Sequence, residues 1–181
     1  DLQGVSLGSY AIRLDDAQAS WTLTSELILT SGYLFLEYGA FHSGGHAMSI
    51  RRFISDNTKE RTVTLGASTV TLGQFWFMKN NTNLTFDAGT STIVWDGGNT
   101  LSFDGGDATF HELQANIPSG MAYLRGNTSF QLIEKTGEGD LRVEDNLQVS
   151  GDVALTEGSI TLRGTTNLGY LTLSSGTIVR M

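Results

Sequence analysis

A short phrase of strand and turn residues recurs along this chain. It reads Leu-Thr-Ser-Gly-Tyr-Leu at 29–34, Leu-Thr-Glu-Gly-Ser-Ile at 155–160 and Leu-Ser-Ser-Gly-Thr-Ile at 173–178. A second phrase, Gly-Ala-Ser-Thr-Val at 66–70, returns as Gly-Thr-Ser-Thr-Ile at 89–93. The last two copies of the first phrase are 18 residues apart, and the copies of the second are 23 apart. A strand-and-turn unit that returns about every 20 residues is typical of a solenoid, in which one coil cannot bury its apolar face alone.

The alternation of side chains predicts the secondary structure. Apolar and polar residues alternate with period two over segments of three to five residues bounded by Gly, Asn or Asp, as in half-buried strands. We therefore expect an all-β protein, a right-handed parallel β-solenoid (β-helix) of about eight to nine short-stranded coils. It would form a single domain over residues 1–181. Residues 39–60 fit the period worst and include a helix-like spacing around Met48–Ile54, so we interpret them as an irregular insertion or a broader loop.

The composition excludes several classes of protein. Cysteine is absent, so the chain has neither a disulfide framework nor a thiolate metal site. No apolar run approaches the ~18 residues of a membrane-spanning helix, so we expect no membrane insertion. The net charge of −8 and the lack of a basic cluster argue against nucleic acid as a partner. The longest basic runs, Arg51-Arg52 and Lys59-Glu60-Arg61, are interpreted as solvated turn charges.

The two ends of the chain carry similar sequences. Leu171-Thr-Leu-Ser-Ser-Gly176 is close to Leu27-Ile-Leu-Thr-Ser-Gly32, which indicates one unit of a longer tandem array. Neither end has an obvious polar cap, although the end of a solenoid leaves backbone groups unpaired. We therefore expect the ends to stack on adjacent coils or on other copies of the chain.

Three segments carry a resemblance to a known class of proteins. Leu65-Gly-Ala-Ser-Thr-Val-Thr-Leu72, Asn83-Leu-Thr-Phe-Asp-Ala-Gly-Thr-Ser-Thr-Ile93 and Gly105-Gly106 before Phe110 are similar to the β-strand repeats of large secreted bacterial surface proteins. They also resemble phrases in some phage structural proteins. The resemblance covers residues 20–115 well and 141–180 more loosely. It implies a passive extracellular stalk, adhesin or appendage shaft on a cell surface or virion, and it carries over no catalytic residue.

Two tryptophans are candidates for contact with a glycan. Alternation places Phe75 and Phe77 on one side of a strand and Trp76 on the other. An exposed Trp76 would be a binding residue, whereas a coil wide enough to bury two aromatic rings is the alternative that we favour. Trp95 is the second aromatic candidate, because a carbohydrate site requires rings that stack on the sugar, and Trp76, Trp95 and Phe103 would supply them.

Carboxylates recur after the predicted strands and leave three interpretations open. Asp96, Asp104 and Asp107 are the candidate binding residues, and Asp87 belongs to the same series. In the favoured interpretation they accept backbone N–H bonds in turns. A calcium site built from turn carboxylates, or a pair of catalytic carboxylates for polysaccharide cleavage, are the alternatives.

The remaining candidate is a histidine pair. His42 and His46 lie four residues apart in a Gly-containing loop, and we interpret them as turn residues because a third ligand is not fixed nearby.

The function that we expect is non-enzymatic, a rigid structural or adhesive extracellular module without a cofactor. The alternatives are a phage tail fibre or spike that binds a host surface glycan and, third, a β-helix enzyme that degrades polysaccharide.

Overall fold

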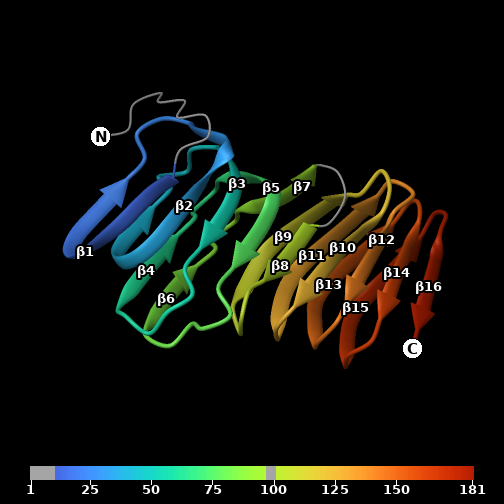
Figure 1. Ribbon diagram of the computed structural model, residues 1–181. Helices are drawn as coiled ribbons and strands as arrows, with labels where there is room; N and C mark the ends of the chain where they lie inside the picture. The colour runs from blue at the N-terminus through green and yellow to red at the C-terminus, as the bar shows by residue number, and fades with distance from the viewer. Residues whose placement is uncertain (1–10, 97–100) are drawn as a thin grey trace.

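The computed structural model describes residues 11–96 and 101–181, where all regular structure is β-strand. The strands join through parallel pairings into one continuous sheet, wound into a β-solenoid of about 8 turns. Figure 1 shows them side by side in a row, from β1 at one end to β16 at the other. Their bounds are β1 (Ala11–Thr22), β2 (Leu27–His42), β3 (Met48–Ile54), β4 (Arg61–Thr64), β5 (Thr69–Phe77), β6 (Leu84–Asp87), β7 (Thr92–Asp96), β8 (Leu101–Asp104), β9 (Thr109–Asn116), β10 (Met121–Arg125), β11 (Thr128–Thr136), β12 (Asp140–Val143), β13 (Leu147–Leu155), β14 (Ser159–Leu162), β15 (Thr166–Leu173) and β16 (Thr177–Arg180).

Each coil has three sides, which we name A, B and C in chain order. Side A is unbroken, and its inward residues pair in the series Leu27, Met48, Val70, Ile93, Leu113, Ile133, Val153 and Leu171. Side B is also unbroken, through Ile12, Leu34, Phe53, Trp76, Phe103, Leu124, Val143, Leu162 and Arg180. The predicted parallel β-solenoid is therefore confirmed.

Side C is divided into two parts. The first pairs Trp21, Phe41, Val63 and Phe86 across β1, β2, β4 and β6. The second pairs Phe110, Phe130, Val149 and Leu168 across β9, β11, β13 and β15. No strand pairing joins β6 to β9 among the described residues, but the rings of Phe86 and Phe110 lie 4.7 Å apart between centroids. The apolar core therefore continues where the hydrogen-bonded ladder does not.

The corners between sides change along the chain. β2 covers sides A, B and C, and β3 and β5 each cover sides A and B, with loops between sides C and A. In β9, β11, β13 and β15 one strand covers sides C and A, and the turn lies between A and B. The change falls where side C is interrupted.

Residues 39–42 and 48–54 are strands of the solenoid, and 43–47 and 55–60 are the loops that join them to the next strands, so the interpretation of 39–60 as an insertion is wrong. Residues 39–42 of β2 pair with β4, and β3 pairs with β2 on one side and β5 on the other. The helix-like spacing has a simple cause. Ile50 faces inward on side A and Phe53 faces inward on side B, so the corner between them shifts the alternation by one residue.

Aromatic rings fill the middle of the core. The Trp76 ring stacks on Phe53 at 4.2 Å and on Phe103 at 5.8 Å between centroids. Phe110 meets the edge of the Trp76 ring at 5.8 Å and stacks on Phe130 at 5.4 Å. These five rings come from four successive coils, so the core couples each coil to its neighbours.

The described residues contain no helix of the length and apolarity that crossing a membrane would require.

We expect Trp76→Ala to destabilise the fold by about 3–5 kcal/mol, because it removes the ring at the centre of this stack. Trp76→Phe should cost far less, since Trp76 Nε1 is buried with no hydrogen-bond partner among the described residues. Chemical denaturation measures both variants. Tyr170→Ala is the matched control, because this aromatic residue is 75% exposed and its loss should change stability by less than about 0.5 kcal/mol. An equal loss in Trp76→Ala and Tyr170→Ala would contradict the prediction.

Candidate functional site

Neither tryptophan can meet a ligand at the surface. Trp76 and Trp95 are both 0% exposed and point into the core from sides B and A. The predicted alternation in 75–77 is present, but Trp76 faces inward and the two phenylalanines outward. The expectation of an exposed Trp76, and the alternative that buries both phenylalanines, are therefore wrong. The core has room for an indole here because Phe53 and Phe103 lie flat against it.

Two of the predicted aspartates begin rows of side-chain hydrogen bonds along the corners. Asp107 Oδ1 accepts a bond from Asn127 Nδ2 at 3.0 Å, and Asn127 Oδ1 accepts one from Asn146 Nδ2 at 2.8 Å, at the corner of sides B and C. At the corner of sides A and B, Asp96 Oδ1 accepts a bond from Asn116 Nδ2 at 3.1 Å. These carboxylates stabilise corners between coils.

Asp104 is the one predicted aspartate that is buried. Its Oδ1 accepts a hydrogen bond from the backbone N of Gly106 at 3.2 Å, as expected for a turn carboxylate. A Cβ on Gly126 of the next coil would lie 2.6 Å from Oδ1, so the absence of a side chain there makes room for the carboxylate. Burial raises the pKa of Asp104, and the Gly106 N–H and the charge of Lys79 oppose this rise only in part.

The histidine pair, interpreted from the sequence as turn residues, lies at the end of a strand and in the turn after it. His42 ends β2 on side C, whereas the backbone N of His46 bonds Ser43 O in the turn that follows. Over residues 11–96 and 101–181, no group of three His, Cys, Asp or Glu side chains could hold a metal ion. Calcium binding remains an untested hypothesis.

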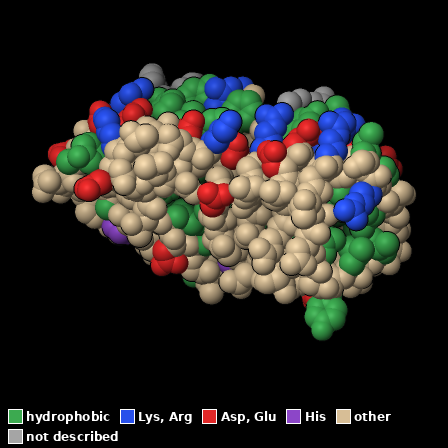
Figure 2. Space-filling model, turned by 90° about the horizontal axis from the view of Figure 1, so that it is seen from below, with side chains coloured by type: hydrophobic (Ala, Val, Ile, Leu, Met, Phe, Trp, Pro, Cys, Tyr) green, Lys and Arg blue, Asp and Glu red, His purple; other side chains and the backbone are tan. Residues whose placement is uncertain are grey.

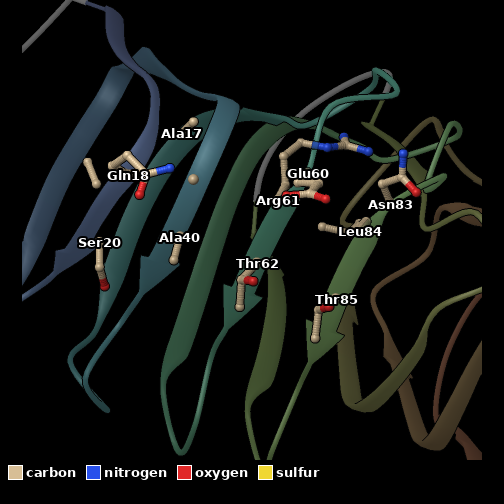
Figure 3. A pocket seen from close by; sticks show the side chains of 12 residues that line it. Ala17, Gln18, Ser20, Ala40, Glu60, Arg61, Thr62, Asn83, Leu84 and Thr85 are labelled. Carbon is tan, nitrogen blue, oxygen red and sulfur yellow. The ribbon is translucent and has the colours of Figure 1, made fainter.

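A polar groove lies on the outside of side C. Its volume is about 570 Å³. Ser20, Ala40, Thr62 and Thr85 follow one another along neighbouring strands, with Gln18, Glu60 and Asn83 farther along the same groove (Figure 3). Glu60 is the single carboxylate among its described lining residues, so the groove lacks the second acid that glycoside hydrolysis requires.

One wall of the groove is a bulge in β1. Between Asp15 and Ser20 the strand gains three residues over its partner β2, where the paired residues are Tyr38 and Ala40. Gly39 makes this possible, because its φ is +78° and a Cβ there would lie 2.3 Å from Asp16 O and 2.6 Å from Ala19 O. The groove is thus shaped by backbone packing.

Two buried cations donate hydrogen bonds to backbone carbonyl groups at the corners of the coils. Arg61 donates to the carbonyl oxygens of Ser55, Asn57, Lys59, Asn80 and Thr82, tying the loop after β3 to the loop after β5. Lys135 Nζ donates to the carbonyls of Thr136, Gly137 and Glu157. Burial lowers the pKa of both groups. Their donors are used inside the protein, so neither cation is available to a ligand.

A second surface, on side B, was missed by the sequence analysis. We name it the arginine–aromatic face, formed by Arg13, Tyr33, Phe35, Arg52, Phe75 and Phe77. The Arg52 guanidinium lies 4.7 Å from the ring centroids of both Tyr33 and Phe75. Arg13 lies 5.2 Å from Phe35 and pairs with Glu37 at 3.0 Å. In the view of Figure 2, Lys and Arg side chains gather along the upper edge, with hydrophobic side chains between them.

The interpretation of the basic runs as solvated turn charges holds for Lys59 and Glu60, which are exposed in the loop after β3, and is wrong for Arg52 and Arg61. Arg52 lies within β3 between two rings, and Arg61 is buried. The sequence contains no local signal for this face, because Tyr33, Arg52 and Phe75 belong to three different coils and meet only through strand register.

We expect Asp104→Asn to stabilise the protein at neutral pH. The raised pKa means that folding favours the protonated carboxyl, so the stability of the unmodified protein should fall as pH rises through the folded-state pKa of Asp104. Asparagine keeps an oxygen acceptor for Gly106 N without the buried charge, and this pH dependence should disappear. Urea denaturation from pH 4 to pH 8 measures both effects, with the exposed Asp152→Asn as the control. Destabilisation of Asp104→Asn at neutral pH would show that the charge is needed.

Comparison with known proteins finds no counterpart: no family model, no curated protein and no solved structure matches this chain. The fold is therefore assigned from its own strand pairings. Membership of the bacterial surface proteins or phage structural proteins, whose repeat sequences this chain resembles, stays a prediction from the sequence.

Proposed function

We propose that this chain is a rigid, non-enzymatic module of an extracellular structure, such as a stalk, filament or surface layer. The observation that carries the proposal is the unbroken side A, which pairs residue to residue from Leu27 to Leu171. Each inner coil is hydrogen-bonded to a neighbour on both sides, so opening one coil disrupts two interfaces.

The corners support a mechanical role. Arg61 and Lys135 bind backbone carbonyls of successive loops, and the Asp107–Asn127–Asn146 row links three further turns. These bonds join coil to coil along the axis, in the direction in which a shaft must resist separation. The side C groove favours this role over polysaccharide cleavage, since Glu60 has no partner acid among the described residues around it.

The last described coil supports stacking on a further coil. Leu171 and Leu173 occupy inward positions of side A, yet they are 44% and 51% exposed. Ile178, the inward residue beside them on side B, is only partly buried. Half-exposed apolar residues in a core register fit the inward face of another parallel coil, from a second copy or an adjacent unit.

We expect the chain to resist extension and to unfold coil by coil. Pulled between its ends in a single-molecule force experiment, it should lengthen in steps of about 70 Å, the extended length of a 20-residue coil. A single release of the whole chain at low force would contradict a mechanical role. Release of reducing ends from a polysaccharide panel, abolished by Glu60→Gln, would contradict the non-enzymatic part.

We expect the isolated chain to self-associate through its C-terminal end. Leu171→Asp combined with Leu173→Asp should lower the average mass in sedimentation equilibrium, because charges on the inward face prevent stacking. Thr172→Asp is the matched control, since Thr172 lies between the two leucines and points to the opposite face. A monomer at all concentrations would contradict end stacking. A concentration-independent trimer would favour the spike of a viral appendage.

A further inference from the structure

The arginine–aromatic face contains a cation held in a fixed position. Tyr33, Arg52 and Phe75 are paired residues of β2, β3 and β5, so they succeed one another along the solenoid axis. The guanidinium lies 4.7 Å from each ring centroid, and Arg52 Nε donates to Gln74 Oε1 at 2.7 Å. The side chain is thus restrained by contacts on two sides and by one hydrogen bond. Little conformational entropy remains to be lost when a ligand binds.

The terminal donors of Arg52 are not used within the part of the chain that the structure describes. Its recorded hydrogen bond uses Nε, and Arg51 Nε donates to the same Gln74 oxygen at 3.1 Å. The ion pairs of other arginines, such as Arg13–Glu37 and Arg142–Asp140, involve neither Arg51 nor Arg52. Two adjacent arginines therefore share a neutral amide as their polar partner, in a protein whose net charge is −8.

The chemistry of this arrangement selects a carboxylate. The planar guanidinium fork matches a carboxylate with two parallel N–H···O bonds. The Arg52 guanidinium lies over the faces of the Tyr33 and Phe75 rings, and this cation–π attraction holds the fork in one orientation without using its N–H donors. Tyr33 also carries a phenolic hydroxyl that can donate a hydrogen bond.

The dimensions of the face indicate a single narrow ligand. Each coil presents two outward side chains here, at 33 and 35, 52 and 54, and 75 and 77, about 7 Å apart along a strand. The best-formed cavities of the described residues lie elsewhere, and none of them is lined by these residues. A stable protein interface centres on a pocket that buries an anchoring side chain, whereas the residues of this face project outward in rows. A sugar chain has the width of the ridge and can lay apolar C–H groups on the rings.

We propose that the arginine–aromatic face binds a carboxylated glycan, with Arg52 holding the carboxylate of a uronic-acid-type sugar. Tyr33 and Phe75 flank that carboxylate, while Phe35 and Phe77 contact the neighbouring sugar. This binding function goes beyond the proposed mechanical role and uses residues that the mechanical role does not need. A chain that fails the force experiment could still bind the glycan, so the two proposals fail separately.

Titration of the full 181-residue chain with oligogalacturonate tests the proposal. We expect calorimetric binding of the acid form and at least tenfold weaker binding of its methyl ester, which has the same sugar chain without the charge. Arg52→Gln should weaken binding of the acid form about tenfold, and Arg52→Lys should weaken it less. Arg163→Gln is the matched control, because Arg163 is paired with Glu144 in a remote coil. Unchanged thermal unfolding of Arg52→Gln confirms that its fold is intact.

Several results would overturn the proposal. These are equal binding of acid and ester, no binding at millimolar ligand, or full binding by Arg52→Gln. Equal, Arg52-dependent binding of poly-L-glutamate would assign the face to an acidic protein segment instead. A change in the mass of the protein on Arg52→Gln substitution would assign it to contact between copies of this chain.

Discussion

The stacking of inward side chains from one coil to the next is the constraint on which this structure depends. No coil encloses an interior of its own, because each of its three sides supplies only one or two inward residues. The inward side chains of neighbouring coils must therefore fill the shared interior together, so a small residue in one coil requires a larger one beside it. Lys135 illustrates how strictly this holds, since it occupies an inward position of side A between Ala115 and Leu155. Its apolar stem fills the row beside the small alanine, and its ammonium reaches the corner carbonyls instead of water.

Stacking of the coils leaves backbone carbonyl groups at the corners without strand partners, and side chains at the corners bind these groups. A turn that lies over another turn brings together carbonyl groups with no strand partner, and burying such groups unpaired is costly. Long side chains satisfy them here, with Arg61 where the loops are long and Lys135 where they are short. Ion pairing with a carboxylate would not serve this purpose, because the groups to be satisfied are acceptors only. The cations are thus part of the backbone hydrogen-bonding scheme, which explains why a chain with few basic residues buries two of them.

The sequence was sufficient to predict the solenoid and insufficient to predict its corners. Alternation of apolar and polar residues identified the strands, and the phrase that returns about every 20 residues identified the stacking. A corner, however, removes or adds one residue to the alternation, and the site of the corner changes along this chain. Such a shift made Met48–Ile54 look helical, although Ile50 and Phe53 face the same interior from two sides. The alternation also left open whether Trp76 or its two neighbours point inward. It places Trp76 on the opposite side of the strand from these neighbours, but it does not say which side faces the core.

The candidate surface was harder to predict than the fold for a related reason. Inward positions are constrained to be apolar in every coil, so their periodicity reveals architecture and carries little information about function. Information about a ligand resides in the outward positions, where composition is free to vary, and its meaning depends on which outward residues become neighbours. Tyr33, Arg52 and Phe75 are separated by 19 and 23 residues, and a shift of one residue in either pairing would turn a member of the row inward. Only the register of the strands, which the unequal corner loops set, places a cation between two rings.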